Sequence, residues 1–282
     1  GNWLSPDDVR IEGSEKARQA FHVTSGDTVT IGAVEKMSKS KRNTVDPQDI
    51  IDQYGADTAR WFMLSDSPPE RDVEWTEAGV EGAWRFAQRF WSTIADPANT
   101  DLGNVGAAMP EGTMSDVATG LRKISHKAVD TITDAIEKFH FNRAVAHIYE
   151  LSNAIRKAAP DLRGGGPADQ WALREAMGFA TQLIAPMMPH LAETCWQHIG
   201  GQGLVIQAPW PKADPALLVE DSITIAIQVN GKRRAEMDIA KDLPNDEVET
   251  LALSQDRIIE AMDGKSPRKV IVVPNRIVNI VV

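Results

Sequence analysis

Lys36-Met37-Ser38-Lys39-Ser40-Lys41-Arg42 is the most informative stretch of this sequence, because it places four cationic side chains within seven positions. The chain as a whole is acidic, with 30 lysine and arginine residues against 40 aspartate and glutamate residues and a net charge of −10. Ammonium groups and hydroxyls suit phosphate oxygens, so the stretch predicts a loop that wraps a polyphosphate. A solvated basic turn is the alternative interpretation, because short basic runs are weak motifs.

Two short helices are predicted directly after this basic stretch. Asp46 is a good N-cap, Pro47 fits a first helical turn, and Gly55 is typical of a helix end. A second helix is predicted to open at Asp57 and to run through Leu64. The apolar stripe of the first helix consists of Ile50, Ile51 and Tyr54.

The segment before the basic stretch, residues 1–35, alternates polar and apolar residues around several glycines. Alternation with a period of two is typical of a half-buried β-strand. Short strands are therefore predicted at residues 21–23 and 29–31, in a small β-rich segment that leads into the basic stretch.

Apolar residues recur at intervals of three and four through the middle of the chain, which is the spacing of one face of an α-helix. The pattern predicts five amphipathic helices, at residues 80–94, 117–136, 144–155, 168–185 and 191–199. Connections between them are short, and Gly164-Gly165-Gly166-Pro167 is a turn signal. Such helices are expected to form an antiparallel bundle.

The apolar spacing changes to a period of two after residue 211. Residues 223–229 alternate as in a strand, and Asn230-Gly231 is a strong hairpin signal. A helix with Asn245 as its N-cap is predicted to end at Gly264, and strands are predicted at 269–273 and 277–282. The last region is therefore predicted to be a small ββαββ unit.

Together these patterns predict an α+β fold that is mainly α. A chain of 282 residues is long enough for two or three domains. The predicted domains are residues 1–76, with the β-rich segment, the basic loop and two short helices; residues 77–212, the helical bundle; and residues 220–282, the small α/β unit.

Composition limits the classes to which the protein can belong. Its net charge of −10 argues against binding of polyanions through bulk charge, so nucleic acid must be bound through local basic patches. The single Cys195 cannot form a disulfide within the chain and suits a reducing compartment. Because neither a membrane-length apolar run nor a signal-peptide pattern is found, we expect a soluble, cytoplasmic protein. Since the sequence begins abruptly with Gly1, we also expect a piece of a longer protein or a processed product.

No metal site is predicted. His190, Cys195 and His198 lie close in sequence, but their spacing on a helix does not bring them together and no fourth ligand is near. Cys195 is instead expected in the core, where free cysteines are commonly buried. His140 and His147 flank a helix start, and we assign no chemistry to either of them.

Several stretches resemble leucyl-tRNA synthetases of the bacterial type. Residues 36–40 are identical to the signature loop of the class I aminoacyl-tRNA synthetases, the class that contains this family. The resemblance covers nearly the whole chain after residue 30 and indicates the C-terminal portion of the family's proteins. The other matching stretches are 54–60, 69–75, 79–86, 185–193, 228–232 and 268–274.

The resemblance implies that the whole protein is a leucine–tRNA ligase. In this reaction ATP activates leucine as leucyl-adenylate with loss of pyrophosphate, and the leucyl group is then transferred to the 3′ adenosine of tRNA(Leu). It also implies Mg²⁺ bound with the ATP substrate, a monomeric enzyme, and a signature loop that closes over ATP. The implied catalytic residues are Lys39 and then Lys36, because an ammonium that meets charge growing on pyrophosphate lowers the barrier. The implied ATP-binding residues are Lys36, Met37, Ser38, Lys39 and Ser40.

The family also carries groups that this sequence lacks. Its His-Ile-Gly-His signature lies well before the loop, and nothing before residue 36 supplies it. The run His198-Ile199-Gly200-Gly201 is similar, but its fourth residue is glycine and it ends a predicted helix, so we interpret it as a helix stop. The leucine pocket and the editing domain are absent from this stretch too, and the chain alone is expected to be inactive.

For tRNA, the resemblance implies contacts from both the bundle and the small α/β unit, largely to the backbone. Salt-sensitive binding is expected of the candidate cations as a group. Each is alternatively an ordinary solvated surface charge. The candidates are Arg143, Arg156 and Lys157 in the bundle, and Lys232, Arg233, Arg234, Lys265, Arg268, Lys269 and Arg276 in the small unit.

Two alternatives stay open on the sequence. The chain is a stand-alone, non-catalytic tRNA-binding module with a vestigial loop, or it is part of an isoleucyl- or valyl-tRNA synthetase. An upstream, in-frame nucleotide-binding fold would favour the enzyme over the module. The amino-acid pocket, which would separate leucine from isoleucine or valine, is not in this stretch.

Overall fold

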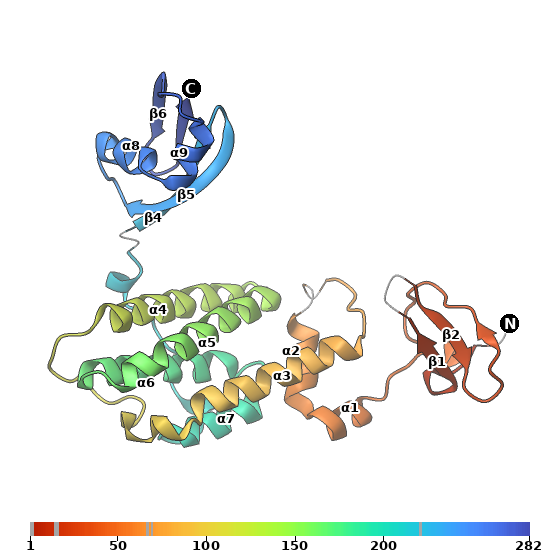
Figure 1. The fold of residues 1–282 in the computed structure, drawn as a ribbon. Helices are drawn as coiled ribbons and strands as arrows, with labels where there is room; N and C mark the ends of the chain where they lie inside the picture. The colour runs from red at the N-terminus through yellow and green to blue at the C-terminus, as the bar shows by residue number, and fades with distance from the viewer. Residues whose placement is uncertain (1–2, 14–16, 66–67, 69, 220–221) are drawn as a thin grey trace. The chain divides into compact units, whose positions relative to one another are not determined.

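The computed structural model describes residues 3–13, 17–65, 68, 70–219 and 222–282. The chain divides into two compact units, Gly1–Ala213 and Asp214–Val282, and each is described by itself (Figure 1). The elements are mostly helical and are accompanied by two small sheets, so the predicted fold class, α+β and mainly α, is confirmed. Short 3₁₀ turns also occur at Pro6–Asp8, Lys39–Lys41, Pro97–Leu102, Val205–Gln207 and Pro215–Leu217.

An antiparallel sheet opens the first unit, with strands β1 (Val9–Glu12), β2 (Gln19–His22) and β3 (Thr28–Val29) in the order β1-β2-β3. Strand β1 was not predicted. Its residues Val9 and Ile11 alternate with Arg10 and Glu12, but the strand is only 4 residues long and mostly exposed. Strand β2 begins two residues before the predicted start at Phe21, and β3 ends at Val29 rather than at Ile31. The β-rich character of the segment is nevertheless confirmed.

Helices α1 (Pro47–Tyr54) and α2 (Ala56–Ser65) follow the basic loop, as predicted. The side chain of Asp46 accepts a hydrogen bond from the amide of Gln48 at 2.9 Å and so caps α1. Gly55 ends α1 with a φ of 85°, a conformation that glycine adopts without steric cost. The chain thereby turns within one residue into α2, which begins one residue before the predicted Asp57.

The helical bundle consists of α3 (Glu77–Ile94), α4 (Asp116–Glu137), α5 (Phe141–Arg163), α6 (Pro167–Ile184) and α7 (Pro189–His198). All five predicted bundle helices are therefore present. Thr76 and Ser115 cap α3 and α4 with their hydroxyls. Helix α5 continues beyond the predicted end and through Pro160, since Leu162 and other late apolar residues are still buried.

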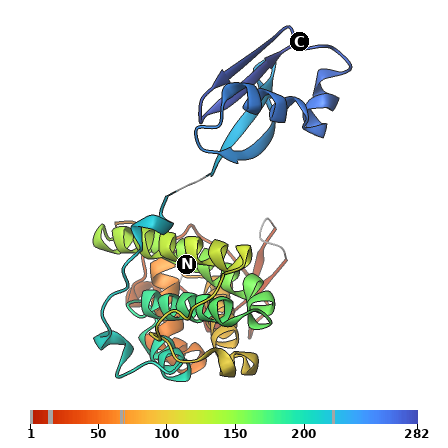
Figure 2. The same cartoon turned by 90° about the vertical axis from the view of Figure 1, so that its left-hand side faces the viewer.

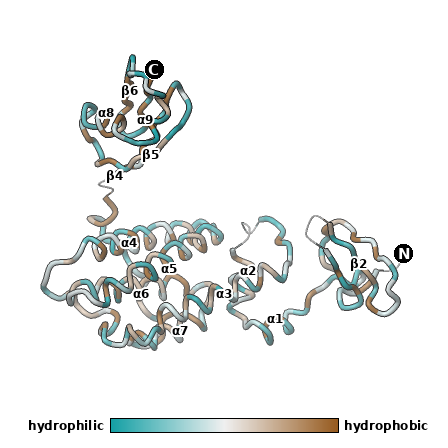
Figure 3. Tube along the Cα trace, in the orientation of Figure 1, coloured by the Kyte–Doolittle hydropathy of each residue, from teal (hydrophilic) through white to brown (hydrophobic). Residues whose placement is uncertain are grey.

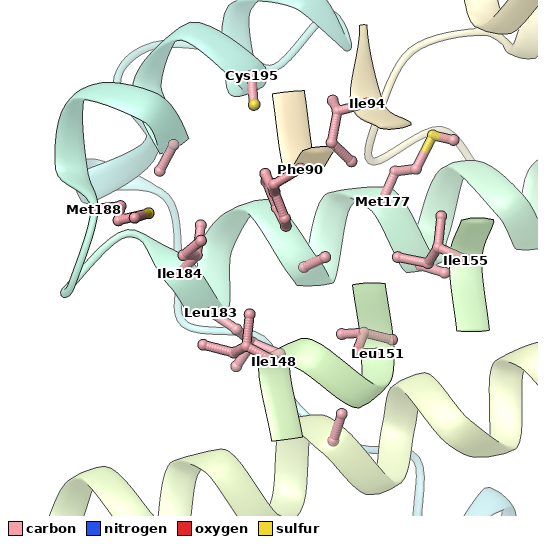
Figure 4. Packing of buried hydrophobic residues seen from close by; sticks show 14 of the residues in the cluster. Phe90, Ile94, Ile148, Leu151, Ile155, Met177, Leu183, Ile184, Met188 and Cys195 are labelled. Atoms are coloured by element: carbon pink, nitrogen blue, oxygen red, sulfur yellow. The ribbon is translucent and has the colours of Figure 1, made fainter. Parts of the chain in front are cut away.

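One hydrophobic core joins α2 to the bundle. Trp61 of α2 is fully buried, and its ring stacks on Phe86 of α3 with the ring centroids 4.7 Å apart. Apolar side chains from α3, α5, α6 and α7 gather in the same space (Figure 4). The helix that follows the basic loop is thus anchored by burial of apolar area, the main stabilising contribution in folding. The core side chains labelled in Figure 4 are Phe90, Ile94, Ile148, Leu151, Ile155, Met177, Leu183, Ile184, Met188 and Cys195.

The second unit is a four-stranded sheet in the order β5-β4-β7-β6, with two helices against one face (Figures 1 and 2). Its strands are β4 (Ser222–Val229), β5 (Lys232–Ala240), β6 (Lys269–Val273) and β7 (Ile277–Val281). The β4–β5 hairpin turns at Asn230 and Gly231, both with positive φ, as in a type I′ turn. Strands β4 and β7 are parallel.

The prediction of a single helix between these strands is wrong. The structure has two helices, α8 (Asn245–Leu253) and α9 (Asp256–Met262), so the unit is ββααββ. Asn245 is the first residue of α8 rather than its N-cap, which is Pro244. With the chain broken into two helices, Val248 of α8 and Ile258 of α9 both lie in the same core.

Hydrophobic residues recur at intervals along the bundle helices instead of forming continuous hydrophobic spans (Figure 3). Among the described residues, no helix combines the length and the apolar character that crossing a membrane requires.

Candidate functional site

The basic loop, residues 36–42, lies between β3 and α1 and is held by one side chain that the sequence analysis did not select. The amide of Ser38 donates to Oδ1 of Asn43 at 2.8 Å, and Nδ2 of Asn43 donates to the carbonyl of Lys36 at 3.4 Å. Asparagine side chains commonly bond to nearby backbone in this way. Asn43 therefore closes the loop upon itself. Its position just after the basic run was the sequence signal by which it could have been selected.

The four cations of the loop differ in their surroundings. Lys41 forms an ion pair with Glu35 and lies over the Trp3 ring at 5.6 Å from its centroid. The side chains of Lys36 and Lys39 are exposed and have no partner among the described residues. The two predicted catalytic lysines are therefore the loop ammoniums that remain available to a bound anion. The hydroxyls of Ser38 and Ser40 lie 3.3 Å apart.

A pocket of about 840 Å³ lies beside the loop. Lys36, Met37 and Asn43 form its loop side, while residues of α1 and α2 and the segment 72–75 form the rest. The lining is largely apolar, with Ile50 and Trp75 among its members. Its charged lining residues are Lys36 and the carboxylates Glu35, Asp72 and Glu74, so the pocket combines an apolar surface with one ammonium and several carboxylates.

Two side chains of α2, those of Asp57 and Arg60, tie this helix to the start of α7. The carboxylate of Asp57 accepts from the amide of Leu191 at 2.7 Å and contacts Nδ1 of His190 at 2.9 Å. Arg60 donates to the carbonyls of Met187 and Pro186, at 3.1 and 2.8 Å. Because Met188 supplies no capping side chain, Asp57 acts as the N-terminal cap of α7 from another helix.

The histidines and the cysteine considered for a metal site lie in separate environments. His190 contacts Asp57, His198 is the last residue of α7 and lies against the ring of Trp91, and Cys195 is buried. Burial raises the pKa of the Cys195 thiol to about 12. Within the described part of the chain, no group of three or more histidine, cysteine, aspartate or glutamate side chains is arranged to hold a metal ion.

The predicted tRNA-binding residues of the bundle, Arg143, Arg156 and Lys157, are all exposed on α5. Arg156 and Lys157 lie within one helical turn. Arg143 is 13 residues earlier, which corresponds to roughly 20 Å along a helix axis. The structure therefore brings two of the three together and leaves Arg143 apart.

The predicted tRNA-binding residues of the second unit are also exposed, but they lie at different edges of its sheet. Lys232, Arg233 and Arg234 begin β5, one edge strand, whereas Lys269 begins β6, the other edge strand. Arg233 is paired with Glu236. These cations therefore form separate groups. The remaining candidates, Lys265, Arg268 and Arg276, lie in the segments that flank β6.

Two families of known proteins match parts of the chain. The family described as tRNA synthetases class I (I, L, M and V) matches residues 22–76, the part that contains the basic loop. The anticodon-binding domain of tRNA ligase matches residues 120–250, which includes most of the bundle and the beginning of the second unit.

Curated relatives match along the whole chain. A leucine–tRNA ligase of Parvibaculum lavamentivorans is 53% identical over 282 residues, which are 100% of this chain and 32% of that protein. One from Mesorhizobium japonicum is 50% identical over 283 residues, again 100% of this chain and 32% of that protein. The chain thus spans about a third of the length of the curated relatives it matches.

Solved structures show the same fold. A ternary complex of LeuRS, tRNA and LeuAMS from Agrobacterium radiobacter K84 superposes with a TM-score of 0.67 and 24% identity, covering 87% of this chain and 30% of that chain. At 24% identity this structure bears on the fold alone, and the family follows from the curated relatives, which are about half identical along the whole chain. The chain belongs to the leucyl-tRNA synthetases of class I and is homologous, along its whole length, to a segment of their leucine–tRNA ligases.

Proposed function

We propose that this chain is part of a leucine–tRNA ligase and supplies the ATP-stabilising loop and tRNA-binding surfaces to the whole enzyme. One observation carries the proposal: half of the residues are identical to leucine–tRNA ligases along the entire chain, and the signature loop is intact. The match to leucine enzymes along the entire chain favours leucine over isoleucine and valine as the substrate. The domains proposed for these roles are 1–76 for the loop and 77–212 and 220–282 for tRNA.

The proposed chemistry begins when a carboxylate oxygen of leucine attacks the α-phosphorus of ATP. A new oxygen–phosphorus bond forms, the bond to the bridging oxygen of the β-phosphate breaks, and pyrophosphate leaves with the electron pair. Lys39, with Lys36 in support, neutralises the charge that grows on the leaving group. Both ammoniums are exposed and uncommitted, which the role requires.

The remaining ligands of the whole enzyme are also part of the proposal. ATP enters with Mg²⁺, and we assign no residue of this chain to that ion. Met37, Ser38 and Ser40 complete the ATP loop, and leucine is bound by residues outside this chain. The exposed cations named above contact tRNA(Leu), mainly through its phosphates. The enzyme is proposed to act as a monomer in the cytoplasm.

The test uses the complete reading frame, with leucine-dependent exchange of pyrophosphate into ATP as the measurement. The complete protein should exchange with leucine and not with isoleucine or valine, and the 282-residue chain alone should not exchange. Lys39→Ala should lower the exchange rate by roughly 10²–10³-fold, the usual cost of losing one group that stabilises transition-state charge.

Lys138→Ala is the matched control, because Lys138 is an exposed lysine at the end of α4 and is paired with Asp134. It should leave exchange unchanged. Exchange driven by isoleucine or valine would assign the chain to a different synthetase. A complete protein that binds tRNA without any exchange would favour the non-catalytic tRNA-binding module.

A further inference from the structure

Arg174 of α6 carries a buried positive charge that meets only a neutral acceptor. The residue is 5% exposed, and Nη2 of its guanidinium donates to the carbonyl of Asn99 at 2.7 Å. Among the described residues, nothing accepts a hydrogen bond from its Nε or Nη1. Burial lowers the pKa of this group, because the charged form loses its hydration. A buried charge is costly unless it is paired, so an anion bound to this guanidinium would be strongly favoured.

Arg174 lines a pocket of about 630 Å³ that lies apart from the signature loop. One wall of the pocket is a face of α6, and the others are the loop 104–107, Trp196 of α7 and the segment 202–209. The lining is mainly apolar and contains three aromatic side chains, those of Trp171, Phe179 and Trp196. This volume and a mainly apolar lining with few polar groups are typical of sites for small molecules.

The lining residues of α6 lie on one face of this helix, because they recur at intervals of three and four. Gly178 is the smallest of them, and a Cβ at this position would clash with Cγ2 of Val105. The absence of a side chain therefore lets the loop 104–107 approach α6 closely and form a wall of the pocket. The α6 residues of the lining are Trp171, Arg174, Glu175, Gly178, Phe179 and Gln182.

Hydrogen bonds hold two walls of the pocket against α6. Nε1 of Trp171 donates to the carbonyl of Ala107 at 2.8 Å. Nε2 of Gln182 donates to the carbonyl of Pro209 at 2.9 Å. The first bond fixes the loop 104–107, and the second fixes the segment 202–209. The pocket is therefore formed before any ligand binds, and a ligand does not have to order its walls.

Glu175 is the one carboxylate in the lining of the pocket, all of which is described, and it is already paired. Its Oε2 accepts from Nε of Arg122 at 2.8 Å, and its Oε1 accepts from Nη2 of Arg122 at 3.4 Å. The same guanidinium lies over the ring of Trp171, with Cζ 5.1 Å from the ring centroid. Glu175 is thus neutralised by Arg122, and the charge of Arg174 remains uncompensated.

One uncompensated positive charge in an aromatic lining fits a ligand with a single negative charge and a flat apolar body. A carboxylate supplies that charge, and its oxygens form strong, charge-assisted hydrogen bonds with guanidinium N–H groups. A phosphate monoester carries a charge nearer −2 at neutral pH, but Arg174 is the only cation in the lining and Glu175 lies beside it. Aromatic rings such as those of Trp171 and Phe179 offer a large contact area to a flat body.

We propose that this pocket binds a small aromatic carboxylate, with Arg174 as the residue that binds the carboxylate and Trp171 and Phe179 as the residues that contact the ring. The carboxylate oxygens accept from the N–H groups of Arg174 that have no partner in the described chain. The site is distinct from the proposed function, because its lining shares no residue with the signature loop or with the cations proposed for tRNA. The ligand supplies the counterion that the folded chain does not give to Arg174.

The test measures binding of 1-naphthoate to the complete protein by isothermal titration calorimetry. Leucine is present at a saturating concentration, so that the probe is not counted in a leucine site outside this chain. The matched probe is 1-naphthamide, which has nearly the same shape and no charge. Naphthoate should bind roughly 10- to 100-fold more tightly than naphthamide, the usual range for a hydrogen bond to a charged group.

Two variants of the complete protein test the site from different sides. Arg174→Met removes the charge and keeps an unbranched side chain, so it should weaken naphthoate binding to the level of naphthamide. Ala107→Trp adds a large side chain at an exposed position of the lining and should abolish binding of both probes. Ala108→Trp is the matched control, because Ala108 is the next exposed residue of the same loop and does not line the pocket. It should bind naphthoate as the wild type does.

Several outcomes would overturn the site. No naphthoate binding to the wild type, or equal affinity for naphthoate and naphthamide, would show that the guanidinium of Arg174 does not bind a carboxylate. Unchanged naphthoate binding in Arg174→Met would place the probe elsewhere. Tighter binding of 1-naphthyl phosphate than of naphthoate would assign the pocket to phosphate esters instead.

Circular dichroism melting checks that each variant is folded. If Arg174→Met does not fold, the pair of loop variants decides, since neither changes the guanidinium of Arg174. Equal naphthoate binding by Ala107→Trp and Ala108→Trp would then show that the probe does not enter this pocket, and the proposal fails.

Discussion

The signature loop and the bundle core lie in the same structural unit but are built in opposite ways. None of the residues 34–45 is buried, and the loop conformation depends on the side chain of Asn43. The core, by contrast, draws fully buried side chains from α2 through α7, among them Trp61 and Leu173. The loop keeps its ammoniums in water, where an anion can reach them, and the core supplies the stability.

The comparison teaches that chemistry and stability are assigned to different residues here. Segments with few buried contacts open at low free energy, and loops that close on ligands are commonly of this kind. Helix α2 connects the two regions, since it follows the loop in sequence and enters the core through Trp61. Substitutions on either side should therefore give different signatures in stability and activity.

The largest effect on stability is expected from Trp61→Ala. The Trp61 ring stacks on Phe86, lies 5.7 Å from the Tyr149 ring, and donates to the Tyr149 hydroxyl at 3.2 Å. Removing it leaves a cavity and should lower the free energy of unfolding by ~3–5 kcal/mol, measured by urea denaturation. Lys39→Ala is the matched variant in the loop and should change it by less than ~0.5 kcal/mol. A loop variant as damaging as the core variant would contradict the comparison.

The next effect is expected from Glu175, which links α6 to α4. Its carboxylate pairs with Arg122 at 2.8 Å and lies 3.5 Å from Nε2 of His126. Glu175→Gln should cost about 2 kcal/mol at neutral pH, the usual magnitude for a partly buried hydrogen bond to a charged group. Asp134→Asn, which breaks the exposed pair with Lys138, should cost only ~0.3–0.5 kcal/mol.

Glu175 also predicts a pH dependence. Burial raises the pKa of its carboxyl, but hydrogen bonds from His126 and Arg122 and their charges outweigh burial and lower the pKa below its ordinary value of 4.5. The unfolded chain therefore binds this proton first as pH falls, so the stabilisation is present above pH 4.5 and is lost below it. Unfolding followed from pH 7 to 3 should show a shallower acid loss in Glu175→Gln than in the wild type. An equal loss of stability with falling pH in both proteins would show that Glu175 is not the source of this pH dependence.

A smaller loss is expected from Asp57→Ala, at the junction between the two regions. The carboxylate of Asp57 caps α7 by accepting from the amide of Leu191. Loss of such a cap should cost ~1–2 kcal/mol in thermal or urea unfolding. His190→Ala removes only a largely exposed partner of the same carboxylate, so its loss of stability should be a few tenths of the loss in Asp57→Ala. Similar losses in both variants would show that the amide bond is not the main contribution.

The last prediction concerns the chemical reactivity of the Cys195 thiol. It is the smallest effect, because this thiol reports on the core without disturbing it. Burial raises its pKa to about 12, and the thiolate is the reactive form. The native chain should therefore resist a disulfide reagent at pH 8 and react only after unfolding. Trp61→Ala should speed the reaction and Lys39→Ala should not. Rapid labelling of the native wild-type chain would place Cys195 outside the core.

Prediction from sequence succeeded where one local signal was strong. The bundle helices have wide apolar stripes, and α1 has a cap, a first-turn proline and a final glycine. Strand β1 was missed although Val9 and Ile11 alternate with Arg10 and Glu12, because a run of 4 mostly exposed residues is a weak strand signal. Helices α8 and α9 were merged because Ser254 and Gln255 are not strong helix breakers. The break at that point is set by packing of both helices on the sheet.

The candidate site was likewise predicted where the signal is local and missed where it depends on distant residues. The sequence placed Lys36 and Lys39 in one exposed loop, but it did not distinguish them from Lys41, whose charge is taken by Glu35 across six positions. The sequence did not identify Asn43 either. It also gave no sign of the link from Asp57 to α7, because the two partners are more than 100 residues apart in sequence.

By itself the sequence determined the signature loop, the helical and strand periods and the family to which they belong, because those are properties of neighbouring residues. Only the tertiary structure decided which cations of the loop are free and which are neutralised. The physical reason is that charge pairing and pocket formation depend on distances between side chains from different elements, and these distances are fixed only when the apolar faces of the helices pack together.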